Sequence, residues 1–311
     1  MSSKTINLLA SCKKKINGCI EVPGDKSISH RAIIISSIAK GETQINHYLN
    51  STDVNATIDA CRHIDAKIEK NNKSLVISGN NLQRIQSEDI ELNFGNSGTS
   101  IRLMMGILSA QNFSSILIGD ESLSKRPMNR VSNPLIKMNA NIKTSNGKTP
   151  LFISPTDCIK NLDHQINVAS AQVKSSIMLA GLYGDDAFTI RAPISRDHTE
   201  IMLSEFGCDI SMHSNSIKVI PSKLTSPNII DIPGDISSAA FFIVGCIISK
   251  NSQIKIENIG LNPLRTGFIK ILKMMGASIE ITDVKKVNGE VIGNINAESS
   301  KLKGVIIPKD L

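Results

Sequence analysis

The chain has 311 residues, of which 41% are apolar and 20% are charged, and its net charge is +7 with histidine counted as neutral. This length suffices for two domains with their own cores, and no apolar run approaches the length of a membrane span. The basic excess does not indicate nucleic-acid binding, because the chain has no Trp, two Tyr and no Lys/Arg block beyond residues 13–15.

The N-terminal segment and the cysteines both indicate a reducing cytoplasm. The short apolar patch Ile6–Ala10 precedes the lysines 13–15, which is the reverse of the order in a secretory signal. Six scattered cysteines without a C-x-x-C pair argue against a disulfide framework or a structural zinc site. We therefore expect a cytoplasmic protein without a bound metal or cofactor.

The first motif with chemical content is Val22-Pro23-Gly24-Asp25-Lys26-Ser27-Ile28-Ser29-His30-Arg31. The apolar run that follows it, residues 32–39, predicts a helix with Ser27 or Ser29 near its N-cap and Gly41 just past its end. A helix N-terminus offers unpaired N–H groups and a partial positive charge. Lys26 adds a cation, and Ser27 and Arg31 share one helix face because they are four residues apart. This combination is suited to a small, multiply anionic ligand.

Four later stretches repeat this arrangement along the chain. A Gly-flanked polar loop with Asn96 and Gly98 leads into a predicted helix 101–110, and Lys125-Arg126 precede Pro127, which suits the first position of a helix. Ser170-Ala171-Gln172 begin a predicted helix that runs to Leu182. Ser195-Arg196 precede another, in which Asp197 and Glu200 resemble a capping box. Each stretch alone is typical of turns and caps, but five such N-termini would create one positive cleft if they converge.

A weak repeat also runs through the chain. An amphipathic helix, a small residue and a short apolar strand recur with the small residues at positions 66, 140, 208 and 277. These spacings are too long for a solenoid and suit a subdomain rich in βαβ units.

A second internal echo suggests where the chain crosses between domains. Val22-Pro23-Gly24-Asp25 recurs as Ile232-Pro233-Gly234-Asp235, and both copies are typical of a strand exit followed by a turn and a helix start. We therefore predict one domain at residues 22–232 with three repeats. A discontinuous domain at residues 1–21 plus 233–311 would hold little more than one repeat and would be incomplete.

Taken together, six motifs resemble those of the 5-enolpyruvylshikimate-3-phosphate (EPSP) synthase family, in the family's order and over essentially the whole chain. They are Asp25-Lys26-Ser27-x-x-His30-Arg31, Gly95-Asn96-Ser97-Gly98-Thr99, Gly119-Asp120-x-Ser122-Leu123-x-Lys125-Arg126-Pro127-Met128, Ser170-Ala171-Gln172-x-Lys174-Ser175, Ser195-Arg196-Asp197-His198-Thr199-Glu200 and Pro233-Gly234-Asp235-x-Ser237-Ser238-Ala239.

The resemblance implies a fold and a reaction. The fold is an α/β (α+β) inverse barrel of two domains, each built from three βαβαββ units, with substrates in the cleft between them. The reaction transfers the enolpyruvyl group of phosphoenolpyruvate to the 5-hydroxyl of shikimate 3-phosphate and releases phosphate, within the shikimate pathway of aromatic amino acid biosynthesis. It needs no metal or cofactor, and the family's proteins are typically monomers that bind neither nucleic acid nor membrane.

The resemblance also implies roles for matching positions. Lys26 is the catalytic residue that contacts both substrates. The residues that bind shikimate 3-phosphate would be Lys26, Ser27, Arg31, Ser170, Ala171, Gln172, Ser195 and Arg196. The residues that bind phosphoenolpyruvate would be Lys26, Asn96, Gly98, Arg126 and Gln172. Arginine suits forked contacts with carboxylate or phosphate better than lysine does.

The chain departs from the family in its acid–base groups. Addition and elimination both need proton transfer, and the family assigns it to Asp-Glu and Lys-Glu motifs that lie downstream of the strand ending here at Pro308. None of Asp283, Glu290 or Glu298 lies in a matching motif. We therefore expect a C-terminally truncated chain that binds weakly or not at all, does not turn over, and exposes apolar faces of its second domain.

Two other functions stay open at this point. One is the sibling enolpyruvyl transferase that acts on UDP-N-acetylglucosamine, although the loop from Gly119 to Pro127 lacks the cysteine which that enzyme commonly uses. The other is a non-catalytic anion-binding module derived from the enzyme.

Overall fold

The computed structural model describes residues 15–71 and 74–308, and the predictions on the N-terminal apolar patch and on the last three residues lie outside them. The chain divides into two compact units. The larger unit comprises Pro23–Pro233 and the turn Lys286–Val291. The smaller unit comprises Met1–Val22, Gly234–Lys285 and Ile292–Leu311, as far as these are described. That each unit folds as a separate domain stays a prediction.

Every sheet among the described residues has four strands and the same pairing pattern. In each sheet one edge strand pairs in parallel with its neighbour, namely β13 with β2, β5 with β6, β9 with β10 and β1 with β14, and that neighbour pairs antiparallel with the next strand. The orders are β13-β2-β4-β3, β5-β6-β8-β7 and β11-β12-β10-β9 in the larger unit and β1-β14-β16-β15 in the smaller one. A parallel pair needs a helical crossover, so this pattern makes each sheet part of one βαβαββ unit.

The first sheet of the larger unit, with its helices, is formed by α1 (Lys26–Ile38), β2 (Glu42–Asn46), α2 (Thr52–Arg62), β3 (Lys67–Asn71), β4 (Ser74–Ser78) and, from much later in the chain, β13 (Ile229–Asp231). The second repeat runs β5 (Ile90–Asn93), α3 (Gly98–Leu108), β6 (Ser115–Ile118), α4 (Glu121–Ser124), α5 (Asn129–Lys137), β7 (Asn141–Ser145) and β8 (Lys148–Ser154). The third runs β9 (His164–Gln165), α6 (Ala171–Gly181), β10 (Phe188–Arg191), α7 (His198–Glu205), β11 (Asp209–His213) and β12 (Ser216–Ile220).

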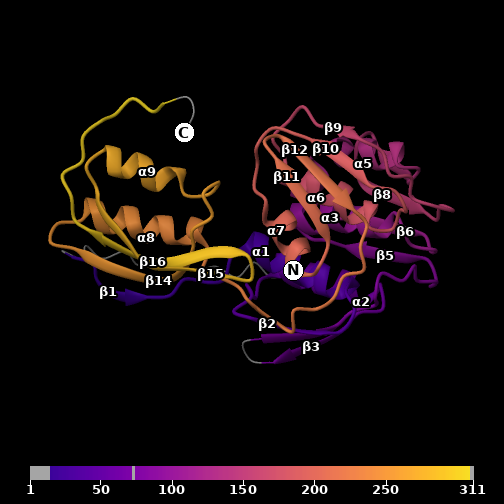
Figure 1. The fold of residues 1–311 in the computed structure, drawn as a ribbon, viewed down its shortest axis with the longest axis horizontal. Helices are drawn as coiled ribbons and strands as arrows, with labels where there is room; N and C mark the ends of the chain where they lie inside the picture. Colours follow the sequence, from indigo (N-terminus) through magenta and orange to yellow (C-terminus); the bar gives the residue numbers. More distant parts are fainter. Residues whose placement is uncertain (1–14, 72–73, 309–311) are drawn as a thin grey trace. The chain divides into compact units, whose positions relative to one another are not determined.

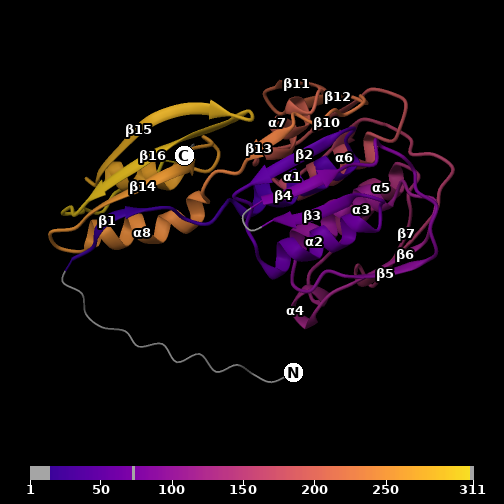
Figure 2. The same ribbon diagram turned by 90° about the horizontal axis from the view of Figure 1, so that it is seen from below.

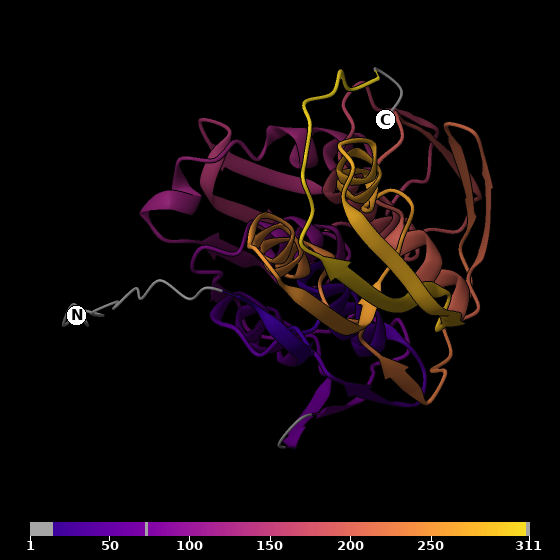
Figure 3. The same cartoon turned by 90° about the vertical axis from the view of Figure 1, so that its left-hand side faces the viewer.

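The smaller unit contains one such repeat. It consists of β1 (Asn17–Ile20), α8 (Ile236–Ile248), β14 (Gln253–Gly260), α9 (Gly267–Met274), β15 (Ser278–Val287) and β16 (Glu290–Glu298). Figure 2 shows its strands in the order β15, β16, β14, β1, and Figures 1 and 3 show α8 and α9 on the same face of this sheet.

The two Pro-Gly-Asp echoes mark where the chain passes between the units. Asp25 N donates to Pro233 O at 2.8 Å, so the two segments at which the chain enters and leaves the larger unit lie side by side. Each aspartate then caps a helix: Asp25 Oδ1 accepts from Ile28 N at 3.0 Å, and Asp235 Oδ1 accepts from Ser237 N at 2.8 Å.

Helices form the centre of the larger unit and its sheets surround them (Figure 1). In α1, every residue from Ile28 to Ile38 is buried, which explains why its isoleucines are not confined to one side of the helix. Helices α3 and α6 pack closely against each other. The contact depends on Gly106, because a Cβ at this position would lie 2.3 Å from the backbone oxygen of Ser176.

The structure confirms the fold class and the repeat and corrects two helix starts. Each small residue of the predicted repeat directly precedes a strand: β3, β7, β11 or β15. The N-cap of α1 is Asp25 rather than Ser27 or Ser29, because the Asp25 carboxylate reaches the amide three residues on. Pro127 is not a first helical residue, since α5 begins at Asn129 with Met128 as its N-cap.

Helix α8 has an uncovered apolar side, as expected for the second domain. Its buried residues, Ile236, Ala239, Ile243, Cys246 and Ile247, form a single stripe. On the other side Phe241 is 82% exposed and Ile248 is 68% exposed. A surface patch of this kind favours association with other apolar surfaces.

The close approach of α3 and α6 yields a stability prediction. Gly106→Ala inserts a methyl group against the Ser176 carbonyl and is expected to lower the free energy of unfolding by about 1–3 kcal/mol. The matched control is Gly245→Ala in α8, where the nearest atom to the new Cβ lies 3.7 Å away. That change is expected to raise stability by about 0.5–1 kcal/mol through helix propensity. Urea unfolding measures both, and equal effects would contradict the packing account.

Candidate functional site

The first two turns of α1, α3, α6 and α7 meet in the larger unit through side-chain hydrogen bonds. Arg31 of α1 reaches Thr199 of α7 and Ser175 of α6. Gln172 of α6 donates from Nε2 to Thr99 Oγ1 of α3 at 3.1 Å. The structure therefore brings four of the predicted anion-binding helix starts together, and their dipoles add at one place.

The first group of side chains, here called the Arg31 cluster, contains Lys26, Ser27, Arg31, Ser175, Arg196 and Thr199. Arg31 Nε donates to Thr199 Oγ1 at 2.6 Å, Nη2 to Ser175 Oγ at 3.0 Å and Nη1 to Ser27 O at 2.9 Å. Arg196 Nη1 lies 3.3 Å from Ser27 Oγ. Arg31 is only 3% exposed, so these neutral oxygen atoms fix a buried guanidinium group without an ion pair to any described carboxylate.

Lys26 lies at the outer edge of this cluster. Its ammonium group pairs with the Asp53 carboxylate, yet the lysine side chain is still 45% exposed. The N-terminus of α2, where Asp53 lies, is tied to α3 because Ser100 Oγ donates to Asp53 O at 3.1 Å. Lys26 is thus oriented from one side and open on the other.

The second group, here called the Arg126 cluster, contains Asn96, Gly98, Arg102, Arg126 and Gln172. Arg102 Nη1 donates to Gln172 Oε1 at 2.9 Å, and Arg126 Nη2 donates to Asn96 Oδ1. A Cβ on Gly98 would lie 3.0 Å from the Nη1 atoms of both arginines. Glycine is therefore needed where the backbone passes between two cations.

Arg31, Arg102 and Arg126 make no ion pair with a described carboxylate. Burial is the main cause that lowers the pKa of Arg31 to about 10; the nearby Glu200 and Asp25 oppose this shift and Arg196 adds to it, so Arg31 is still a cation at neutral pH. Burial, followed by repulsion from Arg126 and Arg130, also lowers the pKa of Arg102. A bound anion would relieve this repulsion, because it adds the missing opposite charge.

The chain is similar to known proteins of one family. A family model described as EPSP synthase (3-phosphoshikimate 1-carboxyvinyltransferase) matches residues 11–309. The chain belongs to the EPSP synthase family.

The relatives are also similar over most of the chain. A 3-phosphoshikimate 1-carboxyvinyltransferase of Vesicomyosocius okutanii is 46% identical over 295 residues, which are 94% of this chain and 68% of that protein. A 3-phosphoshikimate 1-carboxyvinyltransferase of a Thermoanaerobacter species is 44% identical over 298 residues, which are 95% of this chain and 70% of that protein. The solved EPSP synthase of Acinetobacter baumannii superposes with a TM-score of 0.87 at 41% identity, over 96% of this chain and 68% of that one.

The function of the family is therefore the function assigned to the chain: transfer of the enolpyruvyl group to shikimate 3-phosphate in the shikimate pathway. The sibling that acts on UDP-N-acetylglucosamine is set aside, because the relatives named above are 3-phosphoshikimate 1-carboxyvinyltransferases. Among the described residues, no helix has the length and apolar character to span a bilayer.

The structure places most of the sequence-predicted residues in these two clusters. Ser170 is the N-cap of α6, where its Oγ accepts from Val173 N at 3.4 Å, and Ala171 is the first helical residue. Ser195 lies just before α7, and its buried Oγ has no hydrogen-bond partner within the described part of the chain. Its role is the least supported by the geometry.

One sequence interpretation beside the clusters was wrong. Asp197 and Glu200 do not form a capping box: α7 has no side-chain cap, and Glu200 instead pairs with the buried Lys174 at 2.6 Å. Lys125, to which the sequence analysis gave no site role, lies outside the clusters and pairs with Glu121 at the exposed end of α4.

Arg102 is the residue that the sequence reasoning missed. It follows Gly98 by four positions, which is the spacing that marked Ser27 and Arg31 as sharing one face. The four-residue spacing from Gly98 was therefore available as a signal, but the sequence alone does not distinguish Arg102 from an ordinary polar residue in an otherwise apolar helix.

Four carboxylates beside the Arg31 cluster each make a polar contact of their own, although the buried Glu200 Oε2 has no hydrogen-bond partner among the described residues. Asp25 caps α1, Asp53 pairs with Lys26, Glu200 pairs with Lys174, and Glu290 contacts His198. Within residues 15–71 and 74–308, no group of three or more His, Cys, Asp or Glu side chains is arranged to hold a metal ion.

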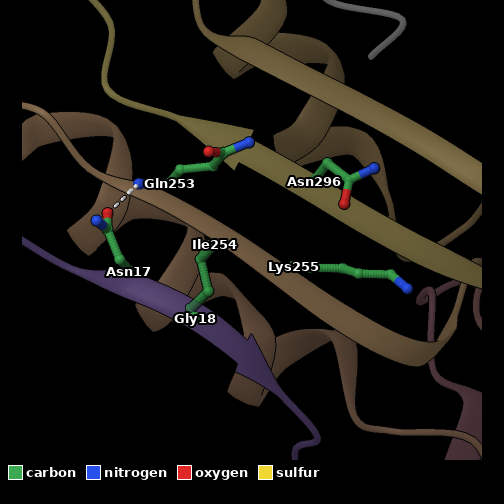
Figure 4. A pocket seen from close by; sticks show the side chains of 6 residues that line it. All are labelled: Asn17, Gly18, Gln253, Ile254, Lys255 and Asn296. Carbon is green, nitrogen blue, oxygen red and sulfur yellow. Dashed lines mark hydrogen bonds between the residues drawn. The ribbon is translucent and has the colours of Figure 1, made fainter.

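A hollow on the smaller unit is less suited to the substrates (Figure 4). Asn17, Gln253 and Asn296 line it from adjacent strands, and Asn17 Oδ1 accepts from Gln253 N at 3.1 Å. Lys255 is the one cation among its described lining residues, and it pairs with Glu257 at 2.6 Å. A polar sheet surface of this kind lacks the charge that a dianion needs.

A buried histidine beneath the site predicts a pH effect. Burial, with Arg31 and Lys26 nearby, lowers the pKa of His30 from 6.5 to about 3, so His30 is neutral when folded. The unfolded chain takes up a proton below pH 6.5 that the folded chain refuses, so the free energy of unfolding falls as pH falls from 6.5 toward 3.

His30→Asn keeps a polar atom near Nδ1, which lies 2.7 Å from Thr57 Oγ1, and removes the titration. We expect the slope of unfolding free energy between pH 5 and pH 6.5 to flatten by up to about 1.4 kcal/mol per pH unit. His213→Asn, on an exposed strand residue, is the control and should leave the slope as in the original chain. Urea unfolding at several pH values in this range measures the slope. An unchanged slope in His30→Asn would contradict a neutral His30.

Proposed function

We propose that the Arg31 cluster binds shikimate 3-phosphate and that the Arg126 cluster binds phosphoenolpyruvate. One observation supports this most strongly. Arg31, Arg102 and Arg126 are all held by neutral oxygen acceptors, so their charge is available for substrate phosphate and carboxylate groups.

The shikimate 3-phosphate half-site combines the Arg31 cluster with the start of α6. Its residues are Lys26, Ser27, Arg31, Ser170, Ala171, Gln172, Ser195 and Arg196. The N–H groups of the first turn of α6 suit the phosphate, and Ser27 Oγ and Arg196 suit the ring substituents. Arg31 still has one N–H free on each terminal nitrogen after its three internal bonds.

The phosphoenolpyruvate half-site comprises Lys26, Asn96, Gly98, Arg126 and Gln172, to which the structure leads us to add Arg102. Two guanidinium groups on either side of Gly98 match a ligand that carries both a phosphate and a carboxylate. Gln172 contacts Arg102 directly and follows Ala171, so it lies where the two half-sites adjoin.

In this proposal the described residues bind, orient and stabilise charge. Holding the acceptor hydroxyl and the enolpyruvyl donor together converts an encounter into an intramolecular step. Negative charge grows on the departing phosphate, and preorganised arginines and helix N-termini stabilise it without rearranging. Proton transfer needs a further group, because the carboxylates beside the Arg31 cluster are engaged within the described part of the chain. A monomeric state and a cytoplasmic location stay predictions.

The phosphoenolpyruvate half-site is tested with Gly98→Ala. The added methyl group would lie 3.0 Å from the Nη1 atoms of Arg102 and Arg126 and would displace them. We expect about tenfold weaker binding of phosphoenolpyruvate, equivalent to about 1.4 kcal/mol, and unchanged binding of shikimate 3-phosphate. Titrations followed by ³¹P NMR report each ligand separately, with Gly245→Ala as the control. Equal loss for both ligands, or no loss, would refute the assignment of Gly98.

A turnover assay tests whether any described carboxylate transfers the proton. We expect the purified 311-residue polypeptide to release no measurable phosphate from the two substrates, because Asp25, Asp53, Glu200 and Glu290 are all engaged. A steady-state phosphate assay measures this. Appreciable release that Glu200→Gln or Asp53→Asn abolishes would show that one of these carboxylates transfers the proton.

A further inference from the structure

The turn between β15 and β16 belongs to the larger unit, a placement that no sequence motif indicated. Asn288 makes two hydrogen bonds to the backbone of β13: its Oδ1 accepts from Asp231 N and its Nδ2 donates to Ile229 O, both at 3.0 Å. Gly289 has a φ of 77°, and a Cβ there would lie 2.6 Å from Ile201 Cγ2 of α7. Glycine therefore lets the turn lie directly against α7.

This docking buries Glu290 against the start of α7. Glu290 Oε1 lies 2.6 Å from His198 Nδ1, and the two side chains are 5% and 2% exposed. His198 is the first residue of α7, and this helix has no side-chain N-cap. The contact therefore ties the side chain of the first helical residue of α7 to the turn between β15 and β16.

The first turn of α7 has three consecutive buried residues that each contact a different part of the larger unit. His198 contacts Glu290, Thr199 accepts from Arg31 Nε, and Glu200 pairs with Lys174 of α6 at 2.6 Å. Thr199 Oγ1 also lies 2.6 Å from Ser175 Oγ. A shift of this turn would move Thr199 away from Arg31, because adjacent residues of a helix move together.

We propose that Glu290 is a positioning residue for the shikimate 3-phosphate half-site, and that it acts through His198 on the first turn of α7. The proposal rests on the proposed function, since it takes the Arg31 cluster as that half-site. Glu290 touches neither Arg31 nor the open side of Lys26 in the observed hydrogen bonds, so it is not a catalytic residue. Its carboxylate orients the imidazole, the imidazole orients the helix start, and Thr199 then holds Arg31.

Two substitutions of Glu290 distinguish a positioning role from a direct effect of its charge on ligand binding. Glu290→Ala removes the hydrogen-bond acceptor and the charge, whereas Glu290→Gln removes the charge and keeps an acceptor for His198 Nδ1–H. If Glu290 acted only through its charge, both variants would bind the anionic ligand more tightly, because a negative group near the cations is gone. If it positions α7, Glu290→Ala binds about tenfold more weakly and Glu290→Gln binds like the original chain.

The experiment titrates shikimate 3-phosphate into the 311-residue chain and its variants and follows the ³¹P resonance. Asp59→Ala, which removes a carboxylate from an exposed ion pair with Arg62 on α2, is the matched control and should bind like the original chain. Loss in Glu290→Ala with recovery in Glu290→Gln supports the proposal. Equal binding by all variants, or tighter binding by both Glu290 variants, overturns it. The proposed half-site requires at least weak binding by the unsubstituted chain, so complete failure of that chain to bind overturns the half-site itself, which keeps the two failures distinct.

A second measurement does not depend on ligand. The Arg31 Nε–H, which donates to Thr199 Oγ1, is expected to give a protected ¹H–¹⁵N signal in the original chain and in Glu290→Gln. Glu290→Ala should lose this protection under conditions in which the variant is still folded, well below its own unfolding midpoint. Retained protection in Glu290→Ala would overturn the proposal even if affinity changed.

Discussion

The Arg31 guanidinium group joins α1, α6 and α7 through hydroxyl and carbonyl oxygen atoms only. A buried arginine is ordinarily paired with a carboxylate, which would stabilise it but would also cancel its charge. Here neutral acceptors satisfy its donors, and acidic groups such as Glu200 and Glu290 lie nearby but make their own contacts with Lys174 and His198. The cation is therefore held rigidly while its field persists outside the protein.

The Arg126 cluster has the same arrangement, in which neutral acceptors hold the cations. This explains why the candidate site draws its residues from several repeats. Arg102 and Arg126 are held by Gln172 and Asn96, and the glycine between them lets the backbone pass without displacing either. Each of the three repeats of the larger unit contributes helix N-termini, and α3 packs closely on α6 at Gly106. Fold and function are thus linked through one requirement: several positive helix ends must lie together without carboxylate partners.

Sequence reasoning recovered much of this because repeats and helix starts are local patterns. The small residues at 66, 140, 208 and 277 marked one strand in each of the four described sheets, and Lys26, Gly98 and Gln172 were singled out from motifs at helix starts. Contacts between distant segments were not predictable in this way. Asp25 was passed over as the cap of α1, Glu200 pairs across helices rather than capping its own, and Glu290 reaches His198 from 92 positions away. Such pairs depend on tertiary packing, for which a single sequence has no local signal.

A crystal structure of the chain with shikimate 3-phosphate is the most direct test of the claim that neutral contacts keep these cations available. The account predicts the phosphate group at the N-terminus of α6, ring contacts from Lys26 and Ser27, and Arg31 still bonded to Thr199 and Ser175. A ligand bound elsewhere on the larger unit, or Arg31 turned to pair with a carboxylate such as Glu200, would contradict it.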